Sequence, residues 1–257
     1  EICACLVGSE MCIRDRLEGV SVRYVSSVQE LGQPDMIFLP GSKNTMGDLC
    51  WMRQNGLEAA VKKLAVHIPV WGICGGYQML GRTISDPHGV ENENSLREPL
   101  RGMELIDTDT TLMPEKMRTQ TRGKFENVTG IFSTLSGLEF SGYEIHMGKT
   151  TVSTGEHQTP LVQLADGRTD GVQRMEKGSE APGVYGSYVH GIFDDGDIAV
   201  RIVQALADKK RVSWKPEAGG DYHAFKEQQY DKLAQGLREH LDMEYVYSIL
   251  QESRISV

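Results

Sequence analysis

The chain has 257 residues, of which 39% are hydrophobic and 25% are charged, as expected for a soluble protein with one large domain or two small ones. Its 36 Asp and Glu outnumber its 27 Lys and Arg, for a formal net charge of -9, which argues against a nucleic-acid surface or an anionic membrane as partner. No apolar run is long enough to cross a bilayer, and five cysteines without disulfide-like spacing indicate a reducing cytoplasm.

Residues 1–16 differ in character from the rest of the chain. They hold three of the five cysteines and show no clear periodicity. They are not a signal peptide, because they lack a basic start and an apolar centre, and Val7–Arg16 looks like translated adaptor sequence. We therefore predict that residues 1–16 are a non-native leader, leave them out of the fold, and expect the chain to be a gene fragment.

The next part of the chain alternates strands and helices. Apolar or alternating runs predict three strands: Val20–Val25, Asp35–Leu39 and His67–Ile73. Helical structure is predicted between them and after them: a short turn within Ser26–Pro34, then Met46–Gln54 with Thr45 as N-cap, and Leu57–Val66. This order implies an α/β fold with a parallel sheet and right-handed crossovers.

The remaining chain is less regular as far as residue 137. Further strands are predicted over Leu100–Ile106, Thr110–Met113, Gly142–His146, Leu161–Leu164, Gly171–Arg174 and Gly183–His190. Helices are predicted over Ile198–Ala207, Tyr222–Leu241 and Met243–Leu250. We assign residues 17–208 to one domain and residues 209–257 to a C-terminal linker and helical extension of the same domain.

Cys74 lies in a glycine-rich segment, Gly72-Ile73-Cys74-Gly75-Gly76. This G-x-C-x-G form is that of a nucleophile elbow with cysteine in place of serine. A nucleophile on a sharp strand-to-helix turn adopts strained backbone angles, so its neighbours must be nearly free of side chains. The first amides of the following helix can favour the thiolate form of cysteine. Cys74 could instead be a small buried hydrophobe, but the surrounding glycines favour the nucleophile.

A cysteine nucleophile needs a base, and the chain has seven histidines. His190 is the first candidate, because it ends a predicted strand and precedes a glycine as Cys74 does; the carboxyl ends of parallel strands meet at one edge of a sheet. His146 is the second candidate on the same grounds. Three carboxylates near these histidines could orient the base or be solvated surface charges: Glu144, Asp194 and Asp195.

An oxyanion hole needs backbone amides about 3 Å from the developing charge. Gly75 supplies one amide as the residue after the nucleophile, and the loop Pro40-Gly41-Ser42 could supply another or be a plain strand exit. The chain contains no phosphate-binding glycine loop, no dinucleotide fingerprint and no metal-ligand spacing. We therefore predict no metal and no cofactor in this chain.

Four stretches resemble the glutamine amidotransferase half of cobyric acid synthase, in the same order along the chain: Pro34–Thr45, Trp71–Gly81, Gly142–Gly148 and Gly186–Asp194. The tail from Tyr222 to Leu250 is similar to the C-terminal helices of that family. The resemblance therefore runs from about residue 20 to the end. The first and third stretches favour this family over its relative cobyrinic acid a,c-diamide synthase.

The resemblance implies a class I glutamine amidotransferase-like (flavodoxin-like) fold, a mostly parallel sheet with helices on both faces plus C-terminal helices, and makes residues 17–208 the amidotransferase domain. It implies that Cys74 attacks the side-chain amide of glutamine and forms a γ-glutamyl thioester, with His190 as general base and acid. Gly41 and Gly75 would line the oxyanion hole, and Gln78 would help to hold glutamine. Glu144 and His146 are candidate supporting residues.

The resemblance also implies a use for the ammonia. A synthetase domain, expected to precede this part and to be missing here, would use ATP and Mg²⁺ to amidate corrinoid carboxylates, converting adenosylcobyrinic a,c-diamide to adenosylcobyric acid in cobalamin biosynthesis. Common class I amidotransferases carry an acid two residues after the histidine; that position is Ile192 here, so the third catalytic residue stays unassigned. The alternatives are an amidotransferase subunit of a related system, either cobyrinic acid a,c-diamide synthase or lipid II isoglutaminyl synthase, and an inactive docking fragment.

Overall fold

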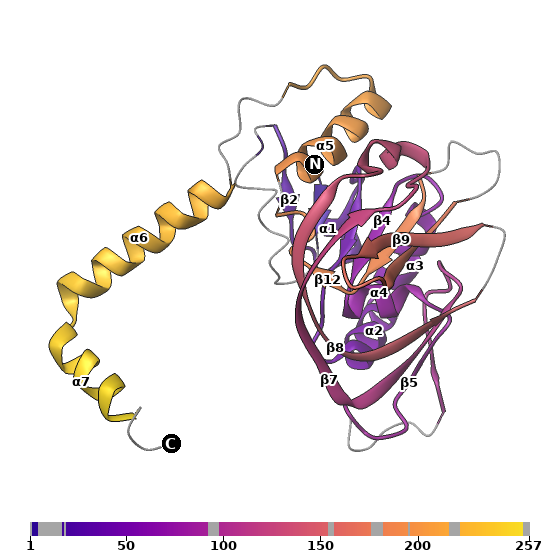
Figure 1. The fold of residues 1–257 in the computed structure, drawn as a ribbon. Helices are drawn as coiled ribbons and strands as arrows, with labels where there is room; N and C mark the ends of the chain where they lie inside the picture. The colour runs from indigo at the N-terminus through magenta and orange to yellow at the C-terminus, as the bar shows by residue number, and fades with distance from the viewer. Residues whose placement is uncertain are drawn as a thin grey trace. The chain divides into compact units, whose positions relative to one another are not determined.

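The computed structural model describes residues 2–4, 17, 19–91, 98–153, 157–175, 182–194, 196–215 and 222–253. They belong to two units, Glu1–Glu217 and Ala218–Val257, each described by itself. The second unit consists of α6 (Tyr222–His240) and α7 (Met243–Ser253), which confirms both helices predicted there (Figure 1). In the described stretches, no helix combines the length and the apolarity that crossing a membrane requires.

The first unit is built on one sheet. Within the described residues it has twelve strands, ten of them in the order β12-β8-β7-β9-β10-β11-β4-β3-β1-β2. One half of this order is parallel: β2 (Val22–Arg23), β1 (Ile2–Ala4), β3 (Ile37–Leu39), β4 (Val70–Ile73) and β11 (Val184–Ser187). The helices between them are α1 (Val28–Leu31), α2 (Thr45–Gln54) and α3 (Leu57–Leu64). This half matches the predicted alternation of strands and helices.

Residues 2–4 take part in this sheet. β1 pairs in parallel with both neighbours, Ile2 with Val22 and Cys3 with Ile37. Leaving all of residues 1–16 out of the fold was therefore wrong for Ile2–Ala4, because this strand supplies the backbone partners that β2 and β3 need. The adaptor-like segment, residues 7–16, lies outside the described residues.

Two local predictions in the parallel half also need correction. β4 begins at Val70 instead of His67, because the amides of His67 and Ile68 still donate to the Leu64 carbonyl at 2.8 and 3.0 Å. The N-cap of α2 is Asn44, whose side chain accepts from the Gly47 amide at 3.1 Å; Thr45, the predicted cap, is the first helical residue.

The other half of the sheet is antiparallel: β10 (Thr169–Arg174), β9 (Gln158–Leu164), β7 (Thr108–Phe125), β8 (Glu139–Val152) and β12 (Val189–His190). β7 and β8 pair along most of their length, far beyond the strands predicted at Thr110–Met113 and Gly142–His146. The sequence analysis missed this ladder because one face of β7 is exposed and polar, with Arg118, Gln120, Arg122 and Lys124 at alternate positions. Pairing with β8, more than local apolar alternation, stabilises it.

The remaining described elements of the first unit are α4 (Gly75–Leu80), β5 (Thr83–Ser85), β6 (Leu100–Arg101), η2 (Gly130–Leu135) and the longer helix α5 (Gly196–Lys210). The strand predicted over Leu100–Ile106 ends early. The amides of Met103 and Leu105 donate to the carbonyls of Met79 and Leu80 at 2.8 and 2.9 Å, so this stretch binds the end of α4 instead of a strand.

The strand predicted over Gly183–His190 is interrupted at Tyr188. Before the break, β11 pairs in parallel with β4; after it, β12 pairs antiparallel with β8, with Val189 opposite Glu144. The hydroxyl of Ser187 accepts from the Val189 amide at 3.0 Å across the break. Because the chain changes its partner strand from β4 to β8, His190 lies beside β8 and not in the parallel half of the sheet.

The core lies around Trp71 of β4, which is fully buried. Its ring stacks on Tyr185 of β11 with centroids 5.1 Å apart and meets Phe193 edge-on, also at 5.1 Å. These aromatic contacts hold β4 and β11 together directly below the strand ends that carry the predicted site residues.

Candidate active site

Cys74 lies on the turn between β4 and α4. Its φ of 52° and ψ of -107° are unusual for a residue with a side chain, which is the strain predicted for a nucleophile on an elbow. The Cys74 amide donates to the Ser187 carbonyl at 2.9 Å, and the thiol lies 3.5 Å from the Ile145 carbonyl oxygen, to which it donates. The nucleophile candidate therefore contacts β11 and β8 as well as its own turn.

The glycines around Cys74 are required by close packing. A Cβ atom on Gly76 would lie 1.9 Å from the Leu39 carbonyl oxygen, and one on Gly72 would lie 2.6 Å from the Gly76 carbonyl carbon. Any side chain at either position would push α4 away from β3 and β4. The G-x-C-x-G pattern is thus explained by how closely the helix approaches the sheet.

Gly41, at the exit of β3, lies between the two predicted catalytic side chains. A Cβ atom on Gly41 would lie 2.8 Å from His190 Cε1, and 3.7 Å from both His190 Nε2 and Cys74 Cβ. The structure therefore brings the cysteine and the histidine to one place. The missing side chain of Gly41 leaves open the space next to both of them.

The imidazole of His190 stacks on Tyr143, with ring centroids 5.1 Å apart and an interplanar angle of 7°. In the β12–β8 pair His190 is directly opposite Tyr143, so both side chains lie on the same face of the sheet. Tyr143 lies in the third of the four family-like stretches, but its sequence gives no sign of this contact, because the contact depends on a strand register that only the fold reveals.

The two predicted oxyanion residues come from neighbouring strand exits. A Cβ atom on Gly75 would lie 2.7 Å from the Ser42 amide nitrogen, so the Gly41–Ser42 loop touches the start of α4. The Gly76 amide donates to the Pro40 carbonyl at 3.0 Å and links the two segments. The two segments therefore lie side by side next to Cys74, and their role as an oxyanion hole stays a prediction.

Gln78 is buried within α4. Its Nε2 donates to the Tyr188 hydroxyl at 3.2 Å, and that hydroxyl is 2.6 Å from Thr150 Oγ1. Burial raises the pKa of Tyr188, so this phenol stays protonated. A Cβ on Gly148 would lie 2.1 Å from Gln78 Nε2. These contacts fix the amide inside the protein, and a role in holding glutamine stays a prediction.

Glu144 and His146 lie on the face of β8 opposite to that of Tyr143, because side chains alternate along a strand. Glu144 is 1% exposed and forms a two-point ion pair with Arg168, with N–O distances of 2.7 and 3.3 Å. Burial raises its pKa, but the nearby imidazole of His146, whose Nε2 is 3.7 Å from Oε1, and the hydrogen bonds from Arg168 outweigh this, and the pKa of Glu144 lies below its usual range. Arg168 is a partner that the sequence analysis missed.

His146 has contacts of its own on this opposite face. Its Nδ1 is 2.8 Å from the Gly148 carbonyl oxygen and carries the proton, because a carbonyl can only accept. Its ring stacks on Tyr188 with centroids 3.8 Å apart. Between the two histidines considered as the base, the structure therefore places His190 beside Cys74 and Gly41, and His146 against Tyr188.

The remaining carboxylate candidates follow His190. Asp194 ends the turn after β12, where its amide donates to the Gly191 carbonyl at 2.9 Å. Asp195 lies outside the described residues. The third catalytic residue stays unassigned.

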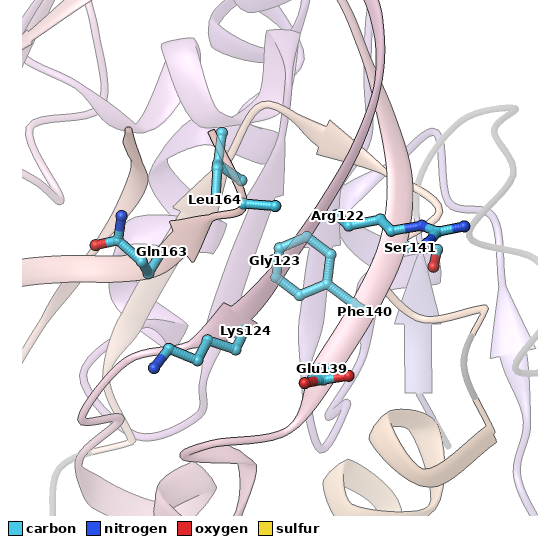
Figure 2. A pocket seen from close by; sticks show the side chains of 9 residues that line it. Arg122, Gly123, Lys124, Glu139, Phe140, Ser141, Gln163 and Leu164 are labelled. Carbon is cyan, nitrogen blue, oxygen red and sulfur yellow. The ribbon is translucent and has the colours of Figure 1, made fainter. Parts of the chain in front are cut away.

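A separate cavity of about 570 Å³ lies on β7, β8 and the end of β9 (Figure 2). Residues of three adjacent strand segments line it: Arg122, Gly123 and Lys124, then Glu139, Phe140 and Ser141, then Gln163, Leu164 and Ala165. None of the predicted site residues lines this cavity, so it is distinct from the Cys74 elbow.

The chain is similar to one protein family and to several curated proteins. The model of the CobB/CobQ-like glutamine amidotransferase domain matches residues 15–198. The cobyric acid synthase of Ruminiclostridium cellulolyticum is 47% identical over 244 residues, and that of Lachnoclostridium phytofermentans is 40% identical over 243 residues. Each match covers 93% of this chain but 45% and 47% of the relatives. The chain thus spans about half the length of the curated relatives it matches.

Solved structures with a similar fold include the following two. A crystal structure of a glutamine amidotransferase matches with a TM-score of 0.52 and 14% identity, covering 82% of this chain and all of that one. A chain of PurLQS from Thermotoga maritima matches with a TM-score of 0.55 and 15% identity, covering 81% of this chain and 98% of that one. These matches confirm the predicted fold class.

Proposed function

Because the chain belongs to the CobB/CobQ-like glutamine amidotransferase family, we propose that Cys74 and His190 hydrolyse the side-chain amide of glutamine. One observation carries this proposal: the position that a Cβ atom on Gly41 would occupy lies 3.7 Å from both Cys74 Cβ and His190 Nε2. A general base must come within reach of the proton that it removes, and this arrangement supports that role for His190.

In the proposed reaction, His190 takes the proton of the thiol and the sulfur of Cys74 attacks the amide carbon of glutamine. The carbonyl oxygen becomes an oxyanion, to which the amides of Gly41 and Gly75 donate. The imidazolium then gives its proton to the amide nitrogen as the C–N bond breaks. Ammonia leaves, and a γ-glutamyl thioester remains on Cys74.

The second half of the reaction returns the enzyme to its starting state. Water attacks the thioester carbon while His190 removes a proton from it. The C–S bond breaks, glutamate leaves, and the proton returns to the sulfur of Cys74. The strained backbone of Cys74 and the stacking of His190 on Tyr143 support this role, because both residues are held in place before substrate arrives.

We further propose that the ammonia serves the amidation of corrinoid carboxylates within a full-length cobyric acid synthase. The names of the curated relatives, with identities of 47% and 40%, support this assignment over the related cobyrinic acid a,c-diamide and lipid II isoglutaminyl systems. In this proposal ATP, Mg²⁺ and the corrinoid bind to the half of such a protein that this chain does not span.

The test is glutamate release from glutamine by the chain and three variants. Cys74→Ala and His190→Ala should each abolish release, whereas Cys50→Ala should retain it, because Cys50 is a free cysteine within α2 and is not part of the elbow. A chloroketone analogue of glutamine should alkylate Cys74 in the wild-type chain. No glutamate release, together with no labelling of Cys74 by the analogue, would overturn the proposal.

A further inference from the structure

Asp170 of β10 is a carboxylate that the proposed mechanism does not use. One of its oxygens, Oδ2, accepts two hydrogen bonds: from the hydroxyl of Ser187 at 2.6 Å and from the amide of Tyr188 at 2.9 Å. Burial raises the pKa of Asp170, although these two bonds act in the opposite direction. Asp170 is half-buried, and a carboxylate withdrawn from water is costly unless it is well bonded.

The residue after Asp170 explains how the carboxylate reaches this position. Gly171 has a φ of 66°, and a Cβ atom on it would lie 2.1 Å from the Gly186 carbonyl oxygen and 3.0 Å from Ser187 Cα. Only glycine allows β10 to come this close to the end of β11. Because of Gly171, the carboxylate of Asp170 lies next to the interruption between β11 and β12.

The residues around the interruption at Tyr188 are linked to both members of the candidate catalytic pair. On one side, the carbonyl of Ser187 accepts the amide proton of Cys74 at 2.9 Å. On the other side, the hydroxyl of Ser187 accepts the amide proton of Val189 at 3.0 Å, and His190 is the next residue. Ser187 is fully buried, so it has no water to replace a lost partner.

We propose that Asp170 is a positioning residue for the Cys74–His190 pair. Its carboxylate receives the Ser187 hydroxyl and the Tyr188 amide, and so fixes the backbone that binds Cys74 at one end and carries His190 at the other. This inference rests on the proposed function. Without the carboxylate, the Ser187 hydroxyl and the Tyr188 amide lose their acceptor. The backbone between β11 and β12 then shifts until these two groups reach another acceptor.

The experiment compares Asp170→Ala with Asp170→Asn in steady-state glutamine hydrolysis. Asp170→Ala should lower kcat roughly 10- to 100-fold, the effect of a small misplacement of reacting groups, and leave KM within about threefold. Asp170→Asn should restore most of kcat, because an amide oxygen can accept both hydrogen bonds. Glu139→Ala, which removes an exposed carboxylate from β8, is the control and should behave as wild type.

Folded fraction is measured for each variant by circular dichroism at the assay temperature. If Asp170→Ala does not fold, Ser187→Ala tests the same contacts with a smaller change and should also lower kcat about tenfold. A folded Asp170→Ala or Ser187→Ala with wild-type kcat overturns the inference, as does a loss of kcat that only follows the folded fraction. The proposed function fails separately, if wild-type activity survives in His190→Ala.

Discussion

The imidazole of His190 lies nearly parallel to the phenol ring of Tyr143, with 7° between the ring planes and 5.1 Å between the centroids. A stacked ring restricts rotation of the imidazole about its side-chain bonds. The β12–β8 register, which sets these two residues opposite each other, therefore determines where the proposed base points.

Removing the ring of Tyr143 should impair hydrolysis. We expect Tyr143→Ala to lower kcat about tenfold, because His190 then samples orientations away from Cys74. Tyr143→Phe retains the stacking surface and should stay within about threefold of wild type. Glutamate release at saturating glutamine measures both variants. A wild-type kcat in Tyr143→Ala would show that the stacking contact does not matter for the base.

Adding one carbon at Gly41 should block the site without unfolding the protein. The new Cβ would lie 2.8 Å from His190 Cε1, closer than such atoms approach, so the imidazole must move. We expect Gly41→Ala to lower kcat/KM at least about 100-fold with little change in melting temperature. Gly236→Ala in α6, where a Cβ meets nothing within 4 Å, is the control. Full activity in Gly41→Ala would contradict the placement of His190.

The same substitution at Gly76 should act on stability instead. Its Cβ would lie 1.9 Å from the Leu39 carbonyl oxygen, a backbone atom that cannot turn aside. We expect Gly76→Ala to lower the free energy of unfolding by about 1–3 kcal/mol, as overpacking does. Urea unfolding of Gly76→Ala and Gly41→Ala side by side measures the contrast. Equal stability of Gly76→Ala and wild type would mean that α4 is not packed against β3 as described.

Glu144 should make the protein sensitive to acid. Its pKa in the folded chain is below the ordinary value of 4.5, because burial, which raises the pKa, is outweighed by the nearby His146 imidazole and the hydrogen bonds from Arg168. A carboxylate of lowered pKa contributes stability that is fully present above its unfolded pKa and is lost as the pH falls through the folded pKa. The free energy of unfolding should therefore decrease as the pH drops below 4.5.

Glu144→Gln isolates this contribution. At pH 7 we expect it to lower the free energy of unfolding by about 1–3 kcal/mol, because Arg168 loses its charged partner. The difference between variant and wild type should shrink at pH 3. Glu139→Gln, an exposed change on the same strand, is the control. A difference that stays constant from pH 7 to pH 3 would contradict the ionised state assigned to Glu144.

Local sequence patterns determined the elbow at Cys74 and the alternating strands and helices that lead to it. A strained turn needs glycines next to it, and a buried strand needs an apolar run. Both requirements therefore produce a recognisable pattern within a few residues of sequence. The same holds for Gly41 and Gly75 as candidate amide donors, because each lies two residues after the end of a predicted strand. These features could be predicted because their physical causes are local.

Only the tertiary structure shows that His190 and His146 lie in different surroundings. Both end a predicted strand and precede a glycine or a Met-Gly pair, so their positions along the predicted strands hardly separate them. Strand pairing distinguishes the two histidines. The β12–β8 register sets His190 opposite Tyr143, and His190 lies near Gly41. Side chains alternate along β8, so His146 lies on the other face of that strand and contacts Tyr188. The long β7–β8 ladder and the contacts of Asp170 likewise depend on partners far away in the chain. Such partners leave no periodic signal in the sequence, because the pairing energy comes from strands that meet only once the chain has folded.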